Sequence, residues 1–65
     1  MNEKQPRLVS ITDAQAILGG ISKPTVYSLV SRGELVKVKI GRRGLITTAS
    51  LDAYIQRITE EAGAA

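Results

Sequence analysis

Apolar residues in the first third of the chain recur at helical spacing. The intervals of three and four residues between them predict a helix over residues 11–18 with one face packed into a core. Ser10 and Asp13 match a capping box at its start, and Ala14 and Ala16 would let a second helix approach closely. The predicted core positions of this helix are Ile11, Ala14, Ile17 and Leu18.

A second helix is predicted over residues 22–32, after a break at Gly19 and Gly20 that Ile21 would plug. Ser22 is a good N-cap, and Gly33 suits the position just beyond a helix end. Two helices joined by a short glycine turn predict a helix-turn-helix, although the same pattern fits an αα-corner with no ligand. The buried face would hold Val26, Leu29 and Val30, and the exposed face Lys23, Tyr27, Ser28 and Ser31.

The hydrophobic period then changes from 3.6 to 2, which predicts a β-hairpin. Strict alternation over residues 36–40 places Val36, Val38 and Ile40 on the core side and both Lys37 and Lys39 in solvent. The segment 41–44 is predicted as a turn between glycines with two arginines at its tip, and residues 45–47 return as the partner strand, with Ile46 inside. A hairpin this short must pack on the helices to be stable.

A last helix is predicted from a cap at Thr47 or Thr48, with an apolar face of Leu51, Tyr54, Ile55 and Ile58. Residues 1–7 read as a flexible arm, 8–59 as the domain and 60–65 as a tail that frays. The expected fold is therefore mainly α with a small β-hairpin: a winged helix-turn-helix made of a helix, a helix, a two-stranded antiparallel wing and a helix.

Composition narrows the possible functions of this 65-residue chain, which contains no Cys, His, Trp or Phe. It offers no thiolate nucleophile, imidazole base or soft metal site, so we expect no enzyme, no metal, no cofactor and no small-molecule substrate. No apolar run approaches the ~20 residues of a membrane span, and we expect a cytoplasmic protein without a membrane partner.

The net charge of +3 conceals a strongly basic middle third. Residues 23–43 carry six cations against Glu34 alone, whereas the first third is balanced and the last is acidic. A solvated basic face would explain this distribution, and so would a surface that binds phosphates of double-stranded DNA.

The winged-helix arrangement assigns candidate DNA contacts to the second helix and the wing. Base-edge or phosphate contacts are expected from Lys23 and Ser28, with Lys23 suited to guanine N7 and O6, and Ser31 is a weaker candidate. Two of the candidates have an equally good structural explanation. Thr25 fits an ordinary first-turn residue of the helix, and Arg32 fits a cation that complements the dipole at the helix C-terminus. The full set is Ser22, Lys23, Thr25, Tyr27, Ser28 and Arg32 on the helix, and Lys37, Lys39, Arg42 and Arg43 on the wing.

Several short segments in order resemble the excisionase family of small winged-helix DNA-binding domains, relatives of MerR, and most of all the excisionases of temperate actinobacterial phages. The segments are 10–14, 18–22, 25–27, 32–35, 40–43 and 51–55. Pro24 and Gly44 depart from the family pattern, where a polar and a bulky residue are common.

The resemblance implies a recombination directionality factor. Such a protein binds repeated sites near a prophage attachment site, associates cooperatively head to tail, bends the DNA and directs the phage integrase toward excision. It places DNA contacts at Ser22, Lys23, Thr25, Tyr27 and Ser28 of the second helix and at Arg42 and Arg43 of the wing. A small transcription regulator of a phage or mobile element needs the same surface, and a protein-binding adaptor would need an aromatic hot spot that the sequence lacks.

Overall fold

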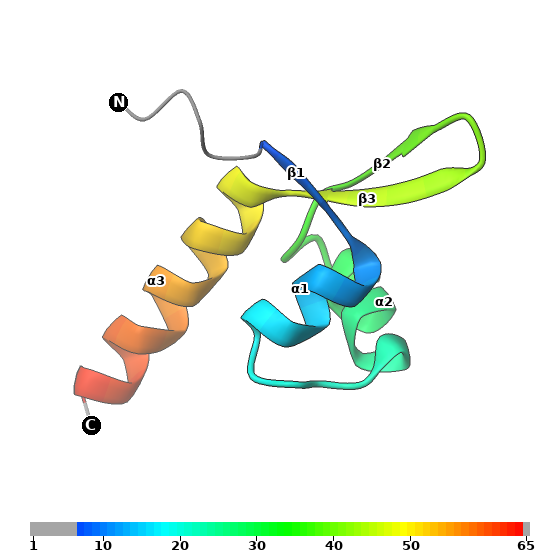
Figure 1. Ribbon diagram of the computed structural model, residues 1–65. Helices are drawn as coiled ribbons and strands as arrows, with labels where there is room; N and C mark the ends of the chain where they lie inside the picture. The colour runs from blue at the N-terminus through cyan, green and yellow to red at the C-terminus, as the bar shows by residue number, and fades with distance from the viewer. Residues whose placement is uncertain (1–6, 65) are drawn as a thin grey trace.

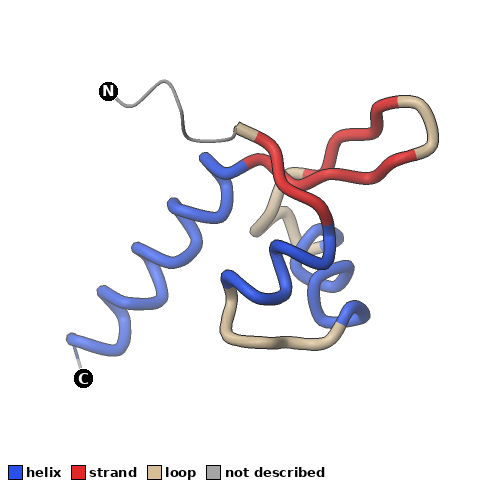
Figure 2. Tube along the Cα trace, in the orientation of Figure 1, coloured by secondary structure: helices blue, strands red, loops and turns tan. Residues whose placement is uncertain are grey.

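The computed structural model describes residues 7–64, which form three helices and a three-stranded antiparallel sheet (Figures 1 and 2). The flexible arm predicted for residues 1–7 lies outside the described residues, apart from Arg7. In chain order the elements are β1 (Leu8–Ser10), α1 (Ile11–Ile17), α2 (Lys23–Ser31), β2 (Lys37–Ile40), β3 (Arg43–Thr47) and α3 (Thr48–Ala64). The predicted winged helix-turn-helix is confirmed.

Both helices of the helix-turn-helix begin and end at the predicted residues or within one of them. The Ser10 hydroxyl accepts from the Asp13 amide at 3.0 Å, and the Ser22 hydroxyl accepts from the Thr25 amide at 3.3 Å. These hydroxyls satisfy first-turn N–H groups that have no partner within a helix. The turn between the helices is held by Gln15, whose side-chain amide donates to the Ile21 carbonyl at 3.0 Å.

Helix α2 ends in a Schellman motif centred on Gly33. The Gly33 amide donates to the Val30 carbonyl at 3.0 Å, and the Glu34 amide donates to the Leu29 carbonyl at 2.9 Å. This pattern requires a left-handed residue after the helix end, and Gly33 has φ +79°. The chain therefore turns sharply toward the wing, which fixes the angle between α2 and the hairpin.

Strand β1 was not predicted, and it changes the wing from two strands to three. The strand order is β1-β3-β2, with Val9 opposite Ile46 and Lys37 also opposite Ile46. Ser10 ends β1 and caps α1, so the sheet continues directly into the first helix. A three-residue strand is too short to show recognisable alternation in the sequence. It is defined by its pairing with β3, which the sequence pattern does not reveal.

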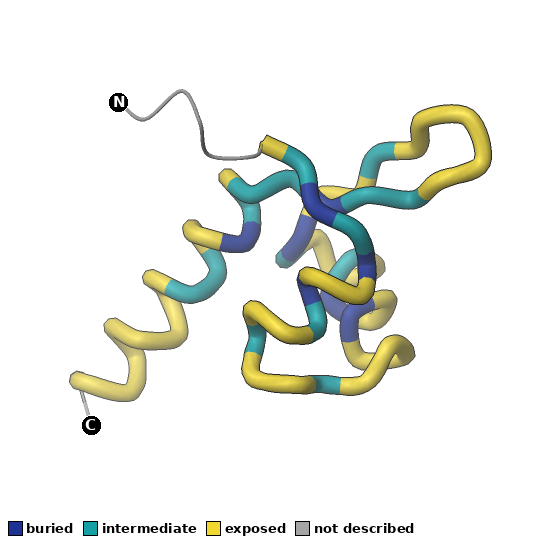
Figure 3. Tube along the Cα trace, in the orientation of Figure 1, coloured by how far each residue is buried: buried dark blue, intermediate teal, exposed yellow. Residues whose placement is uncertain are grey.

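The core lies where β1 and β3 cross the helix pair (Figure 3). The largest of the almost completely buried side chains are Val26 from α2, Leu35 from the loop, Ile46 from β3 and Leu51 from α3. The remaining buried core residues are Val9, Ile11, Ala14 and Leu29, and Leu18, Ile21, Val30 and Tyr54 pack against them. Every element except β2 thus contributes a buried residue, and β2 projects beyond the core with the rest of the hairpin.

The hairpin prediction is right that Lys37 and Lys39 are exposed and wrong that Val36 and Ile40 face the core. Lys37 is opposite Ile46 and Lys39 opposite Gly44, so both lysines share the inner face with a core residue, whereas Val38 shares the outer face with Leu45. The core position at the foot of the strand belongs to Leu35, and alternation from there turns Val36, Val38 and Ile40 outward. Val36 and Ile40 are accordingly 52% and 58% exposed.

In α1, Ile17 is predicted for the core and Ala16 for close contact with a second helix, but both residues are exposed. Ile17 is 49% exposed and Ala16 is exposed as well. Helix α1 ends at Ile17, and α3 diverges from it, leaving an apolar groove of about 340 Å³ between them. The groove is lined by Ile17, Leu18, Ile21, Thr25, Leu29, Tyr54, Ile55 and Ile58.

Helix α3 is capped by Thr47, one of the two predicted candidates. The Thr47 hydroxyl accepts from the Ser50 amide at 3.2 Å, and the Ser50 hydroxyl accepts from the Val36 amide at 3.0 Å, which ties the start of α3 to the start of the wing. The helix continues to Ala64, so the predicted domain end at residue 59 falls inside it. Fraying of residues 60–65 concerns behaviour in solution and stays a prediction.

Candidate nucleic-acid interface

The exposed face of α2 carries most of the predicted helix contacts. Lys23 and Tyr27 are four residues apart on the exposed side of the helix, with Ser31 beside Tyr27 and Ser28 at the far edge of that side, about 140° around the helix from Lys23. All four residues are exposed, whereas Val26 and Leu29 are buried on the opposite side. The helix therefore presents a polar, cationic surface while its apolar side holds it in the core.

Ser22 and Thr25 are engaged in capping α2. Their hydroxyl oxygens lie 2.8 Å apart, and Ser22 also accepts from the Thr25 amide. Thr25 stands roughly 160° around the helix from Lys23 and lines the apolar groove. Of these two residues, Ser22 remains at the helix N-terminus, where amides and a positive helix dipole favour a phosphate, while Thr25 is turned away from Lys23.

The inner face of the wing meets α2 through Lys37. Its ammonium nitrogen lies 5.2 Å from the centroid of the Tyr27 ring, within cation–π range. Lys39 follows on the same face of β2, nearer the tip of the hairpin. Helix and wing thus join in one continuous basic surface that contains Lys23, Tyr27, Lys37 and Lys39.

Arg42 and Arg43 occupy different places, and the predicted four-residue turn is shorter than expected. Ile40 pairs with Arg43, so Gly41 and Arg42 form a two-residue loop, and Arg43 and Gly44 belong to β3. Gly41 has φ +60° and Arg42 does not have a positive φ, the signature of a type II′ turn. Arg42 is at the tip, whereas Arg43 shares the outer face with Ile40, opposite the lysines.

Arg32 is held near the C-terminal end of α2 by Glu34. The nearest Arg32 guanidinium nitrogen lies 3.8 Å from one Glu34 carboxylate oxygen, and Arg57 of α3 forms an ion pair with the other. Arg57 also lies over the Tyr54 ring, 5.7 Å from its centroid. Glu34 and Arg57 are 23 positions apart in the chain, and no spacing rule would have linked them. Of the predicted helix contacts, Arg32 therefore has a carboxylate partner within the protein.

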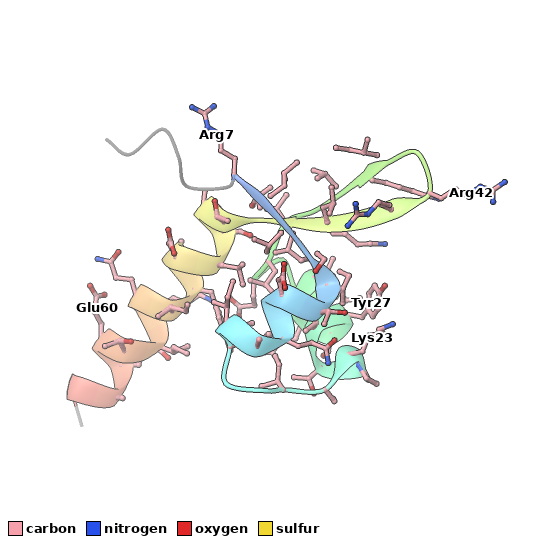
Figure 4. All side chains as sticks on the ribbon, viewed as in Figure 1. Arg7, Lys23, Tyr27, Arg42 and Glu60 are labelled. Atoms are coloured by element: carbon pink, nitrogen blue, oxygen red, sulfur yellow. The ribbon has the colours of Figure 1, made fainter. Side chains whose placement is uncertain are left out.

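Lys23, Tyr27 and Arg42 extend to the same side of the molecule, away from Glu60 on α3 (Figure 4). The structure thus gathers Lys23, Tyr27, Ser28, Lys37, Lys39 and Arg42 along α2 and the wing, with Ser22 at the helix start, and separates Thr25, Arg32 and Arg43 from them. Sequence reasoning missed the contact between Lys37 and Tyr27, because it placed Lys37 on the outer face of the hairpin.

Within residues 7–64 the structure contains no group of three or more Asp, Glu, His or Cys side chains that could hold a metal ion. Over the same residues, no helix has the length and apolar character needed to cross a membrane.

A helix-turn-helix with a cationic outer face and an adjoining basic wing defines the class of winged helix-turn-helix proteins that bind DNA. Comparison with protein-family models agrees: the model described as a helix-turn-helix domain matches residues 8–59. The chain belongs to this family, whose members include excisionase-like DNA-binding proteins and whose domains are typically not enzymes. Comparisons with curated proteins and with solved structures found no match.

Proposed function

We propose that this protein is an excisionase, a recombination directionality factor that binds repeated sites near a prophage attachment site and directs an integrase toward excision. The resemblance of six ordered segments between residues 10 and 55 to that family supports the proposal. The observation that carries its DNA-binding part is the single basic surface formed by α2 and the wing. A transcription regulator would use the same surface, and the experiment below separates the two.

The geometry suggests how such a surface would engage a duplex. Helix α2 lies in the major groove, where the Lys23 ammonium donates to guanine N7 and O6 and Ser28 reaches a base edge or phosphate. The Ser22 end of the helix and Tyr27 contact the backbone, which fixes orientation without reading sequence. Arg42 at the wing tip enters the adjacent minor groove, whose negative potential attracts a guanidinium.

We further propose that copies associate head to tail on DNA, because one module of this size buries only ~600–1,000 Å² on a duplex. The basic wing tip and the free end of α3 lie at opposite ends of the molecule (Figure 1). The outer wing face, with Ile40 and Arg43, would pack into the apolar groove of the next copy, near Glu60 and Glu61. Apolar surface and opposite charge then match between the two ends of successive copies.

Recombination between the cognate attachment sites tests the excisionase proposal. We expect that the purified protein, added with the cognate integrase, raises excision and lowers integration. Lys23→Ala serves as the matched variant, and it should lose this effect together with sequence-selective duplex binding while keeping the helical circular dichroism spectrum. If the wild-type protein binds the sites without altering the ratio of excision to integration, the protein is a regulator and the excisionase proposal is wrong.

A further inference from the structure

The side chain of Lys37 runs diagonally across strand β3 to reach Tyr27. Lys37 is paired with Ile46, and Gly44 is the diagonal neighbour on the same face, within reach of a long side chain. A Cβ atom built on Gly44 would lie 2.8 Å from the Lys37 Cε and 3.5 Å from its Nζ. Real Cβ atoms essentially never approach another heavy atom as closely as 2.8 Å. The end of the Lys37 side chain therefore occupies space that any other residue at position 44 would fill, and because this end is flexible, it is Lys37 that would move, at little cost to the fold.

Gly44 is not required by the backbone. The glycines with a positive φ are Gly19, Gly20, Gly33 and Gly41, and Gly44 is not among them. Inside a strand, glycine costs conformational entropy relative to alanine and buries no side chain. The feature of the described structure that an alanine at this position would disturb is the path of Lys37.

We propose that Gly44 and Lys37 are positioning residues that set the wing relative to α2 by placing the Lys37 ammonium over the Tyr27 ring. They act through Tyr27, which belongs to the proposed DNA surface, and the inference rests on the proposed function in that respect. A lysine held in this way spans the junction between helix and wing. It limits how far the wing can swing away from the helix that reads the major groove.

Affinity for any duplex depends on how many cations reach phosphates, whereas discrimination between sequences depends on where the base-reading side chains are held. Gly44→Ala keeps every cation, so non-specific affinity and its salt dependence should change little. Because an alanine displaces Lys37 from Tyr27, the wing should lose this restraint on its position relative to the helix, while the turn at Gly33 and the pairing of β1 with β3 remain. The selective part of the binding should then fall while the non-specific part remains.

Nuclear magnetic resonance of the free protein tests the placement directly. The ε-methylene protons of Lys37 should resonate upfield of those of an ordinary lysine, because they lie near the face of the Tyr27 ring. Gly44→Ala and Tyr27→Leu should both return these protons toward the ordinary value. Lys39 lies on the same strand face without such a ring contact, and its ε-methylene protons serve as the internal control.

Duplex binding tests the consequence, with a duplex selected from a random library by the wild-type protein and a shuffled duplex of equal composition as probes. Gly44→Ala should lower the ratio of the two affinities about two- to fivefold, the factor that corresponds to an exposed cation–π contact of ~0.5–1 kcal/mol. Lys37→Met should lower the ratio similarly and also flatten the salt slope. Lys39→Met, which removes the same charge from the same face, should flatten the slope without changing the ratio.

An unchanged Lys37 resonance in Gly44→Ala would overturn the placement. A shifted resonance with an unchanged affinity ratio would overturn the positioning role. If the library yields no preferred duplex for the wild-type protein, the proposed function is wrong, and the resonance experiment still decides whether Gly44 places Lys37.

Discussion

Arg42 and Arg43 are neighbours in the chain but differ in what they can reach. Arg42 is a central residue of the two-residue turn and extends beyond the tip of the wing (Figure 4). Arg43 is already in β3, paired with Ile40 on the outer face. Residue type and position in the chain predicted two equivalent cations. The strand register separates them, because successive side chains of a strand point to opposite faces of the sheet.

We therefore expect Arg42→Ala to weaken duplex binding more than Arg43→Ala does. Each phosphate contact contributes about 0.9 to the slope of log affinity against log salt concentration, and the four cations gathered on α2 and the wing together predict a slope of roughly −3 to −4. Arg42→Ala should flatten that slope by about one, as fluorescence anisotropy at several salt concentrations would measure. Circular dichroism controls for the fold, and equal losses in the two variants would contradict the separation of the arginines.

At the scale of the elements, the sequence predicted the helices far better than the sheet. The caps at Ser10 and Ser22 and the stop at Gly33 are local chemistry, so a few consecutive residues suffice to place them. The inner face of the hairpin depends on Leu35, a core residue outside the strand, and on pairing with β3. Alternation alone distinguishes two faces but does not say which one continues into the core, and the lysines lie on the same face as Ile46 while remaining exposed.

The end of α2 is the element that sets the direction of the wing, and Gly33→Ala tests it. An alanine forced into a left-handed conformation should lower the free energy of unfolding by about 1–2 kcal/mol. Gly63 lies in α3 without a positive φ and with open space around it, so Gly63→Ala should leave stability equal or raise it. Urea denaturation followed by circular dichroism compares the two variants, and a neutral Gly33→Ala would refute the requirement for glycine.

At the scale of the whole molecule, basic side chains, acidic side chains and the exposed apolar groove lie on different sides. Lys23 of α2 and Arg42 of the wing extend to one side, and Glu60 lies on the other (Figure 4). The apolar groove opens between α1 and α3, away from the proposed duplex surface, and Ile17 and Ile58 line it while remaining 49% and 39% exposed. Such a groove is available to a neighbouring copy while α2 and the wing are occupied by DNA.

Ile58→Asp should therefore abolish cooperative binding to repeated sites while leaving binding to a single site intact. A carboxylate in the groove removes apolar contact and would have to lose its hydration against the Ile40 side chain of the next copy. Coupling between neighbouring copies of ~1–3 kcal/mol would disappear, a change of about 5- to 150-fold in affinity for tandem sites. Ala53→Asp adds the same charge at an exposed position of α3 outside the groove, and cooperativity that survives Ile58→Asp would rule this surface out.

The three-stranded arrangement has a mechanical consequence. Strand β3 is clamped between β1 and β2, and β1 passes without a loop into the capped start of α1. The base of the hairpin is therefore joined to the helical body through β1, and a force applied at Arg42 in the proposed complex would be carried along β3 and through β1 into the helices. A wing attached only through a free two-stranded ribbon would bend more easily under that force, so the third strand suits the duplex bending that the excisionase proposal requires.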